Sequence, residues 1–186
     1  MGLEMTSLPP VLADFVASAR IAVTLADPAL PDSPLVAANR AFCDMVGYNE
    51  EEVIGRNCRF LQPAGGAGPV RDRIRAFLAS DAASQEQFVI ANVRRGGSRF
   101  LNLVYIAKLV DGEGRRYLLG SQFDATRGRA DMAEIYAAAL MGNIRKLNLM
   151  AGEGGWSILG SYDALANSHR LIAQSRLDQA IAPQQI

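Results

Sequence analysis

The spacing of apolar residues changes several times along the chain, and each change predicts a new element. Apolar residues at helical spacing over residues 11–20 predict a first helix. The next two apolar runs, IAVTLAD (21–27) and LVAAN (35–39), have the length and composition of strands. The segment DPALPDSP between them is rich in Pro and Asp, which favours a loop.

Helices are predicted after the second strand. Asn39 precedes a short apolar segment and Asn49 precedes another, so each asparagine is placed to cap a helix, and both segments end at a glycine. The three glutamates after Asn49 would lie in the first turn of the helix, where negative charge is stabilised by the positive end of the helix dipole. Pro69 opens the segment PVRDRIRAFLAS and predicts a longer helix, because proline is common in a first helical turn.

Three longer strand-like runs complete the pattern: QEQFVIANVRR (85–95), SRFLNLVYIAKLV (98–110) and RRYLLGSQFDAT (115–126). The connections GG and DGEG are short enough for hairpins, so consecutive strands are expected to be antiparallel neighbours. The pattern therefore predicts an α+β domain, with a five-stranded antiparallel sheet and helices on one face.

The chain is expected to divide into an N-terminal helical cap (1–19), the sheet domain (20–126) and a helical C-terminal extension (127–186). One stripe of the extension carries mostly apolar residues at helical spacing. The stripe must be buried against the sheet, against the rest of the extension or against another subunit. Its members are Met132, Ile135, Tyr136, Ala139, Leu140, Asn143, Ile144 and Leu147.

Composition narrows the classes of function. Apolar residues make up 49% of the chain, enough for a core, and 19 basic residues balance 19 acidic ones. This balance argues against attraction to nucleic acid or to a membrane surface. No apolar run approaches the roughly 18 residues of a membrane span, and the N-terminus lacks a secretory pattern. Two cysteines without zinc or disulfide spacing indicate a reducing compartment, so we expect a soluble cytoplasmic protein.

Carboxamides occur inside the predicted strands, although asparagine is depleted there. With GG and DGEG as hairpin tips, Asn92 lies opposite Asn102 to within one residue, and Gln122 lies beside Asn102. Alternation along the strand puts Asn102 on the face of Phe100 and Val104. A buried amide without a partner costs about 1–3 kcal/mol. The partners of this row are therefore each other, water, or a flat heterocycle with donors and acceptors along its edge.

A phosphate on such a ligand would need cations. Arg59 is one candidate, and the predicted helix supplies Arg71 and Arg75 on one face. Arg73 on the same helix fits a solvated position. No GxGxxG or P-loop motif is present, so phosphate binding by a helix N-terminus is not predicted.

The two cysteines have different surroundings. Cys58 stands between an amide and a guanidinium, and a structural thiol usually has less polar neighbours in the sequence. Cys43 lies among apolar residues of a predicted helix and is expected to be a small core residue. His169, the only histidine, is expected to be a surface or packing residue.

These features resemble a known family. The octapeptide GRNCRFLQ (55–62) is similar to the signature of LOV (light, oxygen, voltage) domains, the flavin-binding PAS-fold receptors for blue light. The stretches ALPDSPLVAANRAFCDMVGYNEEEVIG, NVRRGGSRFLN and GSQFDAT resemble the same family. The resemblance covers residues 20–126.

The resemblance assigns roles to individual residues. Cys58 corresponds to the photoactive thiol of the family. The implied cofactor is FMN, with FAD or riboflavin as other flavins of the same kind. Residues similar to those that bind the flavin are Asn57 and Gln62 at the ring edge and ribityl chain, Asn92, Asn102 and Gln122 along the ring, and Arg59 and Arg75 at the phosphate.

The function implied by the resemblance is that of a short blue-light photoreceptor, not an enzyme. Light would add the Cys58 sulfur reversibly to carbon 4a of the flavin. Gln122 would rotate when flavin nitrogen 5 is protonated and would pass the change to the helical extension. The expected output is a change in a homodimer or in binding to a signalling partner. Two alternatives stay open: a flavin-dependent redox protein that uses Cys58, and a PAS module for another ligand.

Overall fold

The structure, a computed structural model, describes residues 8–81, 85–110 and 113–126. It also describes four single residues (138, 142, 145 and 146) and the backbone of residues 157–158. The apolar stripe predicted for the extension, and His169, lie outside the described residues.

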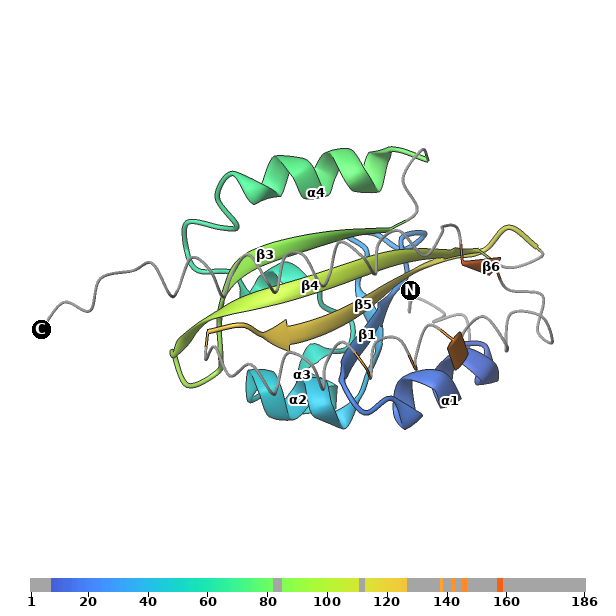
Figure 1. Ribbon diagram of the computed structural model, residues 1–186, viewed down its shortest axis with the longest axis horizontal. Helices are drawn as coiled ribbons and strands as arrows, with labels where there is room; N and C mark the ends of the chain where they lie inside the picture. Colours follow the sequence, from blue (N-terminus) through green and yellow to red (C-terminus); the bar gives the residue numbers. More distant parts are fainter. Residues whose placement is uncertain are drawn as a thin grey trace, which may run out of the picture.

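Five antiparallel strands form the sheet in the order β2–β1–β5–β4–β3 (Figure 1). A two-residue strand, β6 (Ser157–Ile158), pairs with the end of β4 at Leu109 and Val110. The strands are β1 (Ala22–Ala26), β2 (Leu35–Ala38), β3 (Gln85–Val93), β4 (Arg99–Val110) and β5 (Arg116–Asp124). The predicted α+β fold with a five-stranded antiparallel sheet is confirmed.

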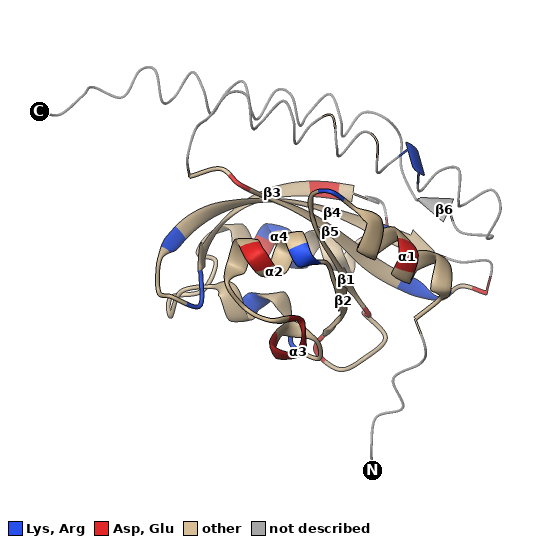
Figure 2. Ribbon diagram, turned by 90° about the horizontal axis from the view of Figure 1, so that it is seen from below, with Lys and Arg blue, Asp and Glu red and all other residues tan. Residues whose placement is uncertain are grey.

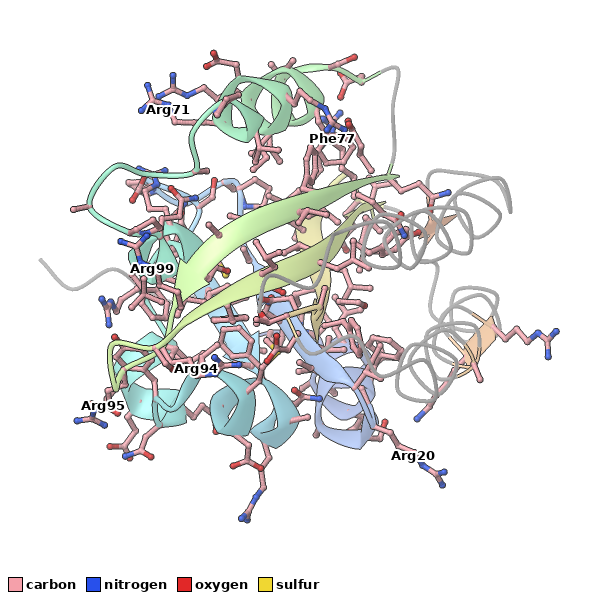
Figure 3. The ribbon with its side chains drawn as sticks, turned by 60° about the vertical axis from the view of Figure 1, so that its left-hand side comes forward. Arg20, Arg71, Phe77, Arg94, Arg95 and Arg99 are labelled. Carbon is pink, nitrogen blue, oxygen red and sulfur yellow. The ribbon has the colours of Figure 1, made fainter. Side chains whose placement is uncertain are left out.

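The helices divide between the two faces of the sheet. Helix α1 (Pro10–Ser18) packs with Val23, Leu25 and Tyr105 on one face. The other face is covered by the segment between β2 and β3. This segment contains α2 (Arg40–Val46), α3 (Glu50–Val53), the 3₁₀ helix η1 (Cys58–Leu61) and α4 (Val70–Ala79). In Figure 3 the Phe77 side chain lies on the sheet side of α4, where its ring is 5.8 Å from that of Phe88.

The predicted caps form as expected. The buried Asn39 Oδ1 accepts hydrogen bonds of 3.0 Å from the backbone N–H groups of Phe42 and Val23, so it caps α2 and ties it to β1. Asn49 and Glu52 form a capping box at the start of α3. These short polar contacts fix how the helices enter the layer beside the sheet.

The strand register differs slightly from the prediction at both hairpins. The hairpin tips place Asn92 within one residue of the position opposite Asn102 and Gln122 beside Asn102. In the structure Asn92 lies opposite Phe100 and Gln122 opposite Val104, so each amide is two residues from the position opposite Asn102. The β3–β4 connection runs from residue 94 to 98, where the backbone N–H of residue 94 donates to the carbonyl of residue 98 and shifts the centre of the hairpin. A shift of two residues preserves the face of the sheet, so all three amides still lie on one side.

Candidate functional site

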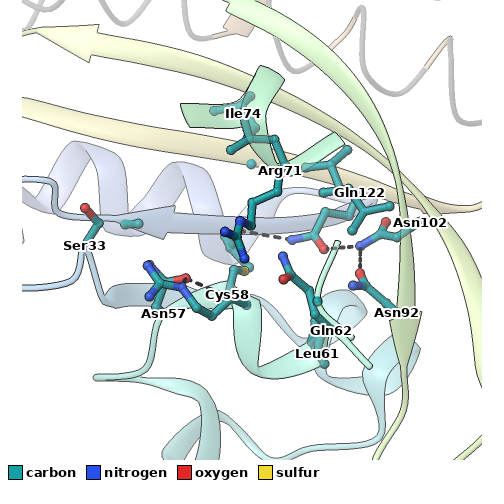
Figure 4. Close-up of a pocket in the computed structure, with 18 of the residues that line it drawn as sticks. Ser33, Asn57, Cys58, Leu61, Gln62, Arg71, Ile74, Asn92, Asn102 and Gln122 are labelled. Atoms are coloured by element: carbon teal, nitrogen blue, oxygen red, sulfur yellow. Dashed lines mark hydrogen bonds between the residues drawn. The ribbon is translucent and has the colours of Figure 1, made fainter. Parts of the chain in front are cut away.

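A cavity of about 610 Å³ lies between the sheet and the covering segment that contains η1 and α4 (Figure 4). Its volume is in the usual range for a site that binds a small molecule. The strands supply one wall, and η1, the loop after it and α4 supply the other. The larger apolar lining residues are Leu35, Leu61, Ile74, Leu78, Ile90, Val104, Ile106 and Leu118.

The carboxamides form a hydrogen-bonded row on the sheet wall. Asn102 Nδ2 donates to Asn92 Oδ1 at 2.9 Å and to Gln122 Oε1 at 2.8 Å. Gln122 Nε2 donates to Thr24 Oγ1 at 3.2 Å, and Figure 4 marks this chain of contacts. The amides therefore partly satisfy one another, as one of the sequence alternatives proposed.

One acceptor of the row is left over. Asn102 is only 1% exposed, yet its Oδ1 has no hydrogen-bond partner among the described residues. An unpaired buried acceptor of this kind is costly, and it lies in the wall of a cavity. The arrangement fits a ligand that presents an N–H donor at the edge of a flat ring, and a flavin has such an edge.

The Cys58 thiol faces the cavity from the opposite wall. Cys58 is the first residue of η1, and Asn57 caps that helix by accepting a hydrogen bond of 3.0 Å from the Arg59 backbone N–H. Burial raises the pKa of the Cys58 thiol to about 12, although a hydrogen bond with the Thr24 side chain lowers it in part. The thiol is therefore neutral at physiological pH.

The mouth of the cavity is rich in guanidinium groups. Arg59 forms a 2.7 Å ion pair with Asp32, and its Nε donates to Asn57 Oδ1 at 3.1 Å. Arg75 lies 3.9 Å from Asp72, which is a weak contact between exposed groups. Together with Arg71, which also lines the cavity, these arginines make this end of the site suitable for an anion.

The structure brings all the sequence-predicted site residues to this one cavity. They come from five separate parts of the chain: η1 and the residues beside it, α4, and the three strands from β3 to β5. The set comprises Asn57, Cys58, Arg59, Gln62, Arg75, Asn92, Asn102 and Gln122. Their proximity is a finding, and their individual roles remain predictions.

Three further residues of the site were not selected from the sequence. Thr24 is buried on β1 and contacts the amide row. Gly120 lies opposite Thr24 on β5, and a glycine inside a strand is a signal of close approach that the sequence offered. Asp32, the partner of Arg59, sits in a loop where it and Ser33 both have positive φ, 67° and 47°. That local conformation had no clear sequence signal.

The described residues also bear on Cys43, on metal binding and on membrane-spanning helices. Cys43 packs against the core cluster around Phe42 and Val46, as expected. No group of three or more potential metal-ligating side chains occurs in the described part of the chain. Within those same residues, every helix is too short or too polar to cross a membrane.

Sequence comparison relates the chain to known proteins. A family model described as a PAS domain matches residues 23–127. The chain is 34% identical over 181 residues to blue-light-activated histidine kinase 1 of Erythrobacter litoralis, covering 86% of this chain and 49% of that protein. The chain thus spans about half the length of this curated relative.

Comparison with solved structures also finds light-oxygen-voltage proteins. The crystal structure of a LOV protein from Rhodobacter sphaeroides matches with a TM-score of 0.70 and 30% identity, covering 92% of this chain and 94% of that one. An RNA-binding light-oxygen-voltage receptor matches with a TM-score of 0.57 and 32% identity, covering 81% of this chain and 39% of that receptor. Similarity to the Rhodobacter protein extends over nearly its whole length.

Proposed function

The chain belongs to the LOV family of PAS domains, and from this premise we propose that it senses blue light with a flavin held in the cavity and with Cys58 as the reactive thiol. The observation that carries the proposal is the position of Cys58 and the amide row on opposite walls of one cavity. The unpaired Oδ1 of Asn102 supports a ligand with a ring N–H at that wall.

The residues around the cavity fit the parts of FMN. The amides of Asn92, Asn102 and Gln122 would hold the polar edge of the ring, between apolar side chains from the sheet and α4. Asn57 and Gln62 flank the reactive segment and would contact the ring edge and the ribityl chain. Arg59 and Arg75 would hold the phosphate, which favours FMN over riboflavin.

The cavity keeps Cys58 in the form that the proposed chemistry needs. When bound, the flavin would supply a light-excited acceptor at carbon 4a for reversible addition of the Cys58 sulfur. Burial keeps the thiol protonated because it raises the pKa to about 12. Arg59 has its charge partly balanced by Asp32 at 2.7 Å, and as a phosphate ligand it would be directed away from the thiol.

The output is proposed to pass through β5 to the residues that follow it. Gln122 lies near the end of β5, two residues before Asp124. Two hydrogen bonds join the residues just after β5 to β4. Ala125 N–H donates to the Leu101 carbonyl at 2.8 Å, and Leu101 N–H donates to Thr126 Oγ1 at 2.7 Å. A rotation of the Gln122 amide is therefore proposed to act on the extension (127–186) and on a homodimer that it forms.

A protein partner fits the charge distribution better than nucleic acid. The chain carries 19 basic and 19 acidic residues. In Figure 2 the acidic residues of α3 lie near basic residues of neighbouring elements, so the two signs are mixed. We propose that this chain signals by association with a protein partner.

Absorption spectroscopy of the purified protein tests the proposal. We expect a flavin band in the dark, its loss under blue light and its recovery in the dark. Cys58→Ala should keep the flavin and abolish the loss, whereas the matched Cys43→Ala variant should behave as wild type. A band bleached only by a chemical reductant would favour the redox alternative. A folded protein that takes up no flavin would favour another ligand.

A further inference from the structure

Lys108 is a buried lysine on the cavity face of β4. It is only 7% exposed, although lysine is among the residue types that are least often buried. It follows Asn102, Val104 and Ile106 at alternate positions of the strand, so its side chain lies on the same face of the sheet as theirs. Burial of an ammonium group is costly unless hydrogen bonds replace the water that it loses.

The partners of Lys108 are carbonyl groups at the end of α4. Its Nζ donates to the Phe77 carbonyl at 2.6 Å and also to the Ser80 carbonyl. The same Nζ lies 4.5 Å from the centre of the Phe77 ring, which is within the range of a cation–π contact. The last carbonyls of a helix lack partners within it, and a cation beside them is favourable. Lys108 therefore joins the C-terminal turn of α4 to β4.

The cavity ends beside this contact. Lys108 is the next position on the cavity face of β4 after the lining residue Ile106, and it lies directly opposite the lining residue Leu118 of β5. On the other wall, the lining residue Leu78 belongs to the turn of α4 that Lys108 binds. The contact between Lys108 and α4 thus closes this end of the cavity.

The position of the amide row decides which part of a flavin would reach the closed end. The row crosses three neighbouring strands, so a ring held there by its polar edge extends along the strands. From Asn102 to Ile106 the strand advances by about 13 Å, at about 3.3 Å per residue, which gives room for a tricyclic ring. The side chains in that direction are apolar. The benzenoid end of the ring would therefore lie at the closed end.

We propose that Lys108 is a positioning residue that fixes the length of the cavity and thereby selects against flavins with a bulky substituent at the benzenoid end. It holds the C-terminal turn of α4 against β4 and so keeps Leu78 at the end of the cavity. This inference deepens the proposed function and rests on it for the flavin. The contact with the helix is independent of any ligand.

Lys108→Met removes the ammonium group and keeps an unbranched side chain of similar length. Because replacing a buried charge with an apolar side chain of similar volume is often neutral for stability, the variant should fold. Lys146→Met is the matched control, since it removes the only other lysine of the chain. Lys146 Nζ donates to Ser18 Oγ of α1 at 2.7 Å, and α1 packs on the opposite face of the sheet.

Hydrogen exchange of the flavin-free protein tests the contact itself. The backbone N–H of Ser80 donates to the carbonyls of Ala76 and Phe77 and thus reports on the last turn of α4. In Lys108→Met this amide should exchange roughly tenfold faster than in the parent, with the amides of β4 unchanged. Lys146→Met should match the parent. Unchanged exchange at Ser80 in Lys108→Met, or an equal acceleration over the whole sheet, would overturn the inference.

Equilibrium dialysis tests the selection among flavins. The two ligands are FMN and an FMN analogue with a dimethylamino group at ring carbon 8, which is on the benzenoid ring. The parent and Lys146→Met should bind the analogue at least roughly tenfold more weakly than FMN, and Lys108→Met should narrow this ratio by roughly three- to tenfold. Equal affinities in the parent, or an equal loss for both flavins in Lys108→Met, would overturn the inference. If the folded parent binds neither flavin, the proposed function fails and the selection with it, and the exchange result still decides whether Lys108 holds the helix.

Discussion

Gly120 faces Thr24 directly across the β1–β5 pair, so closely that a Cβ on Gly120 would lie 2.8 Å from Thr24 Oγ1. The substitution Gly120→Ala is therefore expected to destabilise the fold by about 1–3 kcal/mol through overpacking. In a Thr24→Ala background the cost should fall, because the atom that is contacted is gone. Denaturant unfolding of the four proteins in this cycle measures the coupling. A Gly120→Ala cost that does not depend on residue 24 would contradict the contact.

The protonation state of Cys58 gives a second prediction. Burial raises the pKa of its thiol to about 12, so the thiolate is scarce at neutral pH and grows as the pH rises toward that value. In flavin-free protein, iodoacetamide should therefore alkylate Cys58 slowly at pH 7 and roughly tenfold faster per pH unit above it. Peptide mass spectrometry reports the rate at each cysteine. Unfolded protein is the control, and fast alkylation of folded protein at pH 7 would contradict the raised pKa of the thiol.

Local polar signals predicted much of the fold correctly. Asn39 and Asn49 cap helices because their side chains bond backbone groups a few residues away, and such contacts are encoded within a short segment. The amide row was also predictable. Alternation along a strand fixes the sheet face on which each amide lies, and an offset of two residues in the register leaves that face unchanged. Short-range rules thus sufficed for the elements and for one wall of the cavity.

Contacts between distant segments could not be predicted in the same way. Asp32 pairs with Arg59 only because a loop with two positive φ angles brings them together. Thr24 meets Gln122 across 98 positions of sequence, and β1 carries no pattern that separates this threonine from any other strand threonine. Such residues depend on tertiary register, which the sequence pattern leaves undetermined.

Arg71 gives a prediction about the anionic end of the ligand. It lines the cavity, and in Figure 4 its side chain extends from α4 toward the side where Cys58 lies. No acidic side chain of the described residues forms an ion pair with it, in contrast to Arg59 and Arg73. If FMN binds as proposed, Arg71→Ala should weaken FMN binding roughly tenfold through loss of a charged contact and leave riboflavin binding nearly unchanged.

The matched control for Arg71 is on the same helix. Arg73 forms a 2.6 Å ion pair with Glu86 and does not line the cavity, so Arg73→Ala should leave the affinity for both flavins as in wild type. Fluorescence titrations of flavin-free protein give the four affinities. Equal losses for FMN and riboflavin in Arg71→Ala would mean that the arginine does not contact the phosphate.

Asp124, at the end of β5, predicts how stability depends on pH. It forms an ion pair with Arg94, and the Thr126 backbone N–H donates to it at 2.9 Å. Burial raises the pKa of Asp124, but the hydrogen bonds with Thr126 and the charge of Arg94 outweigh this effect and hold the pKa below its usual value. A lowered pKa stabilises the fold above the unfolded value of about 4, and this contribution is lost as the pH falls through the folded value.

The variant Asp124→Asn should therefore be less stable than wild type by about 1 kcal/mol at pH 7, with the two proteins converging in acid. Denaturant unfolding across this pH range measures the difference. Asp72→Asn is the control, because the side chain of Asp72 is 85% exposed and only loosely paired with Arg75. A difference at pH 7 that persists undiminished in acid would rule out the ionised Asp124 as its cause.

The last prediction concerns the proposed path from the flavin to the extension. Gln122→Leu removes the donor to Thr24 and the acceptor for Asn102, so no amide remains on β5 to change orientation within the row. Because Cys58 lies on the opposite wall, light-induced bleaching should persist in this variant while the light-dependent change in molecular size weakens. Gln62→Leu is the matched control: it also removes an amide from the cavity wall but leaves β5 intact. Light scattering of dark and illuminated samples gives the size change. A full response in Gln122→Leu would place the signal path outside this glutamine, and a loss of bleaching would show that the residue serves the chemistry itself.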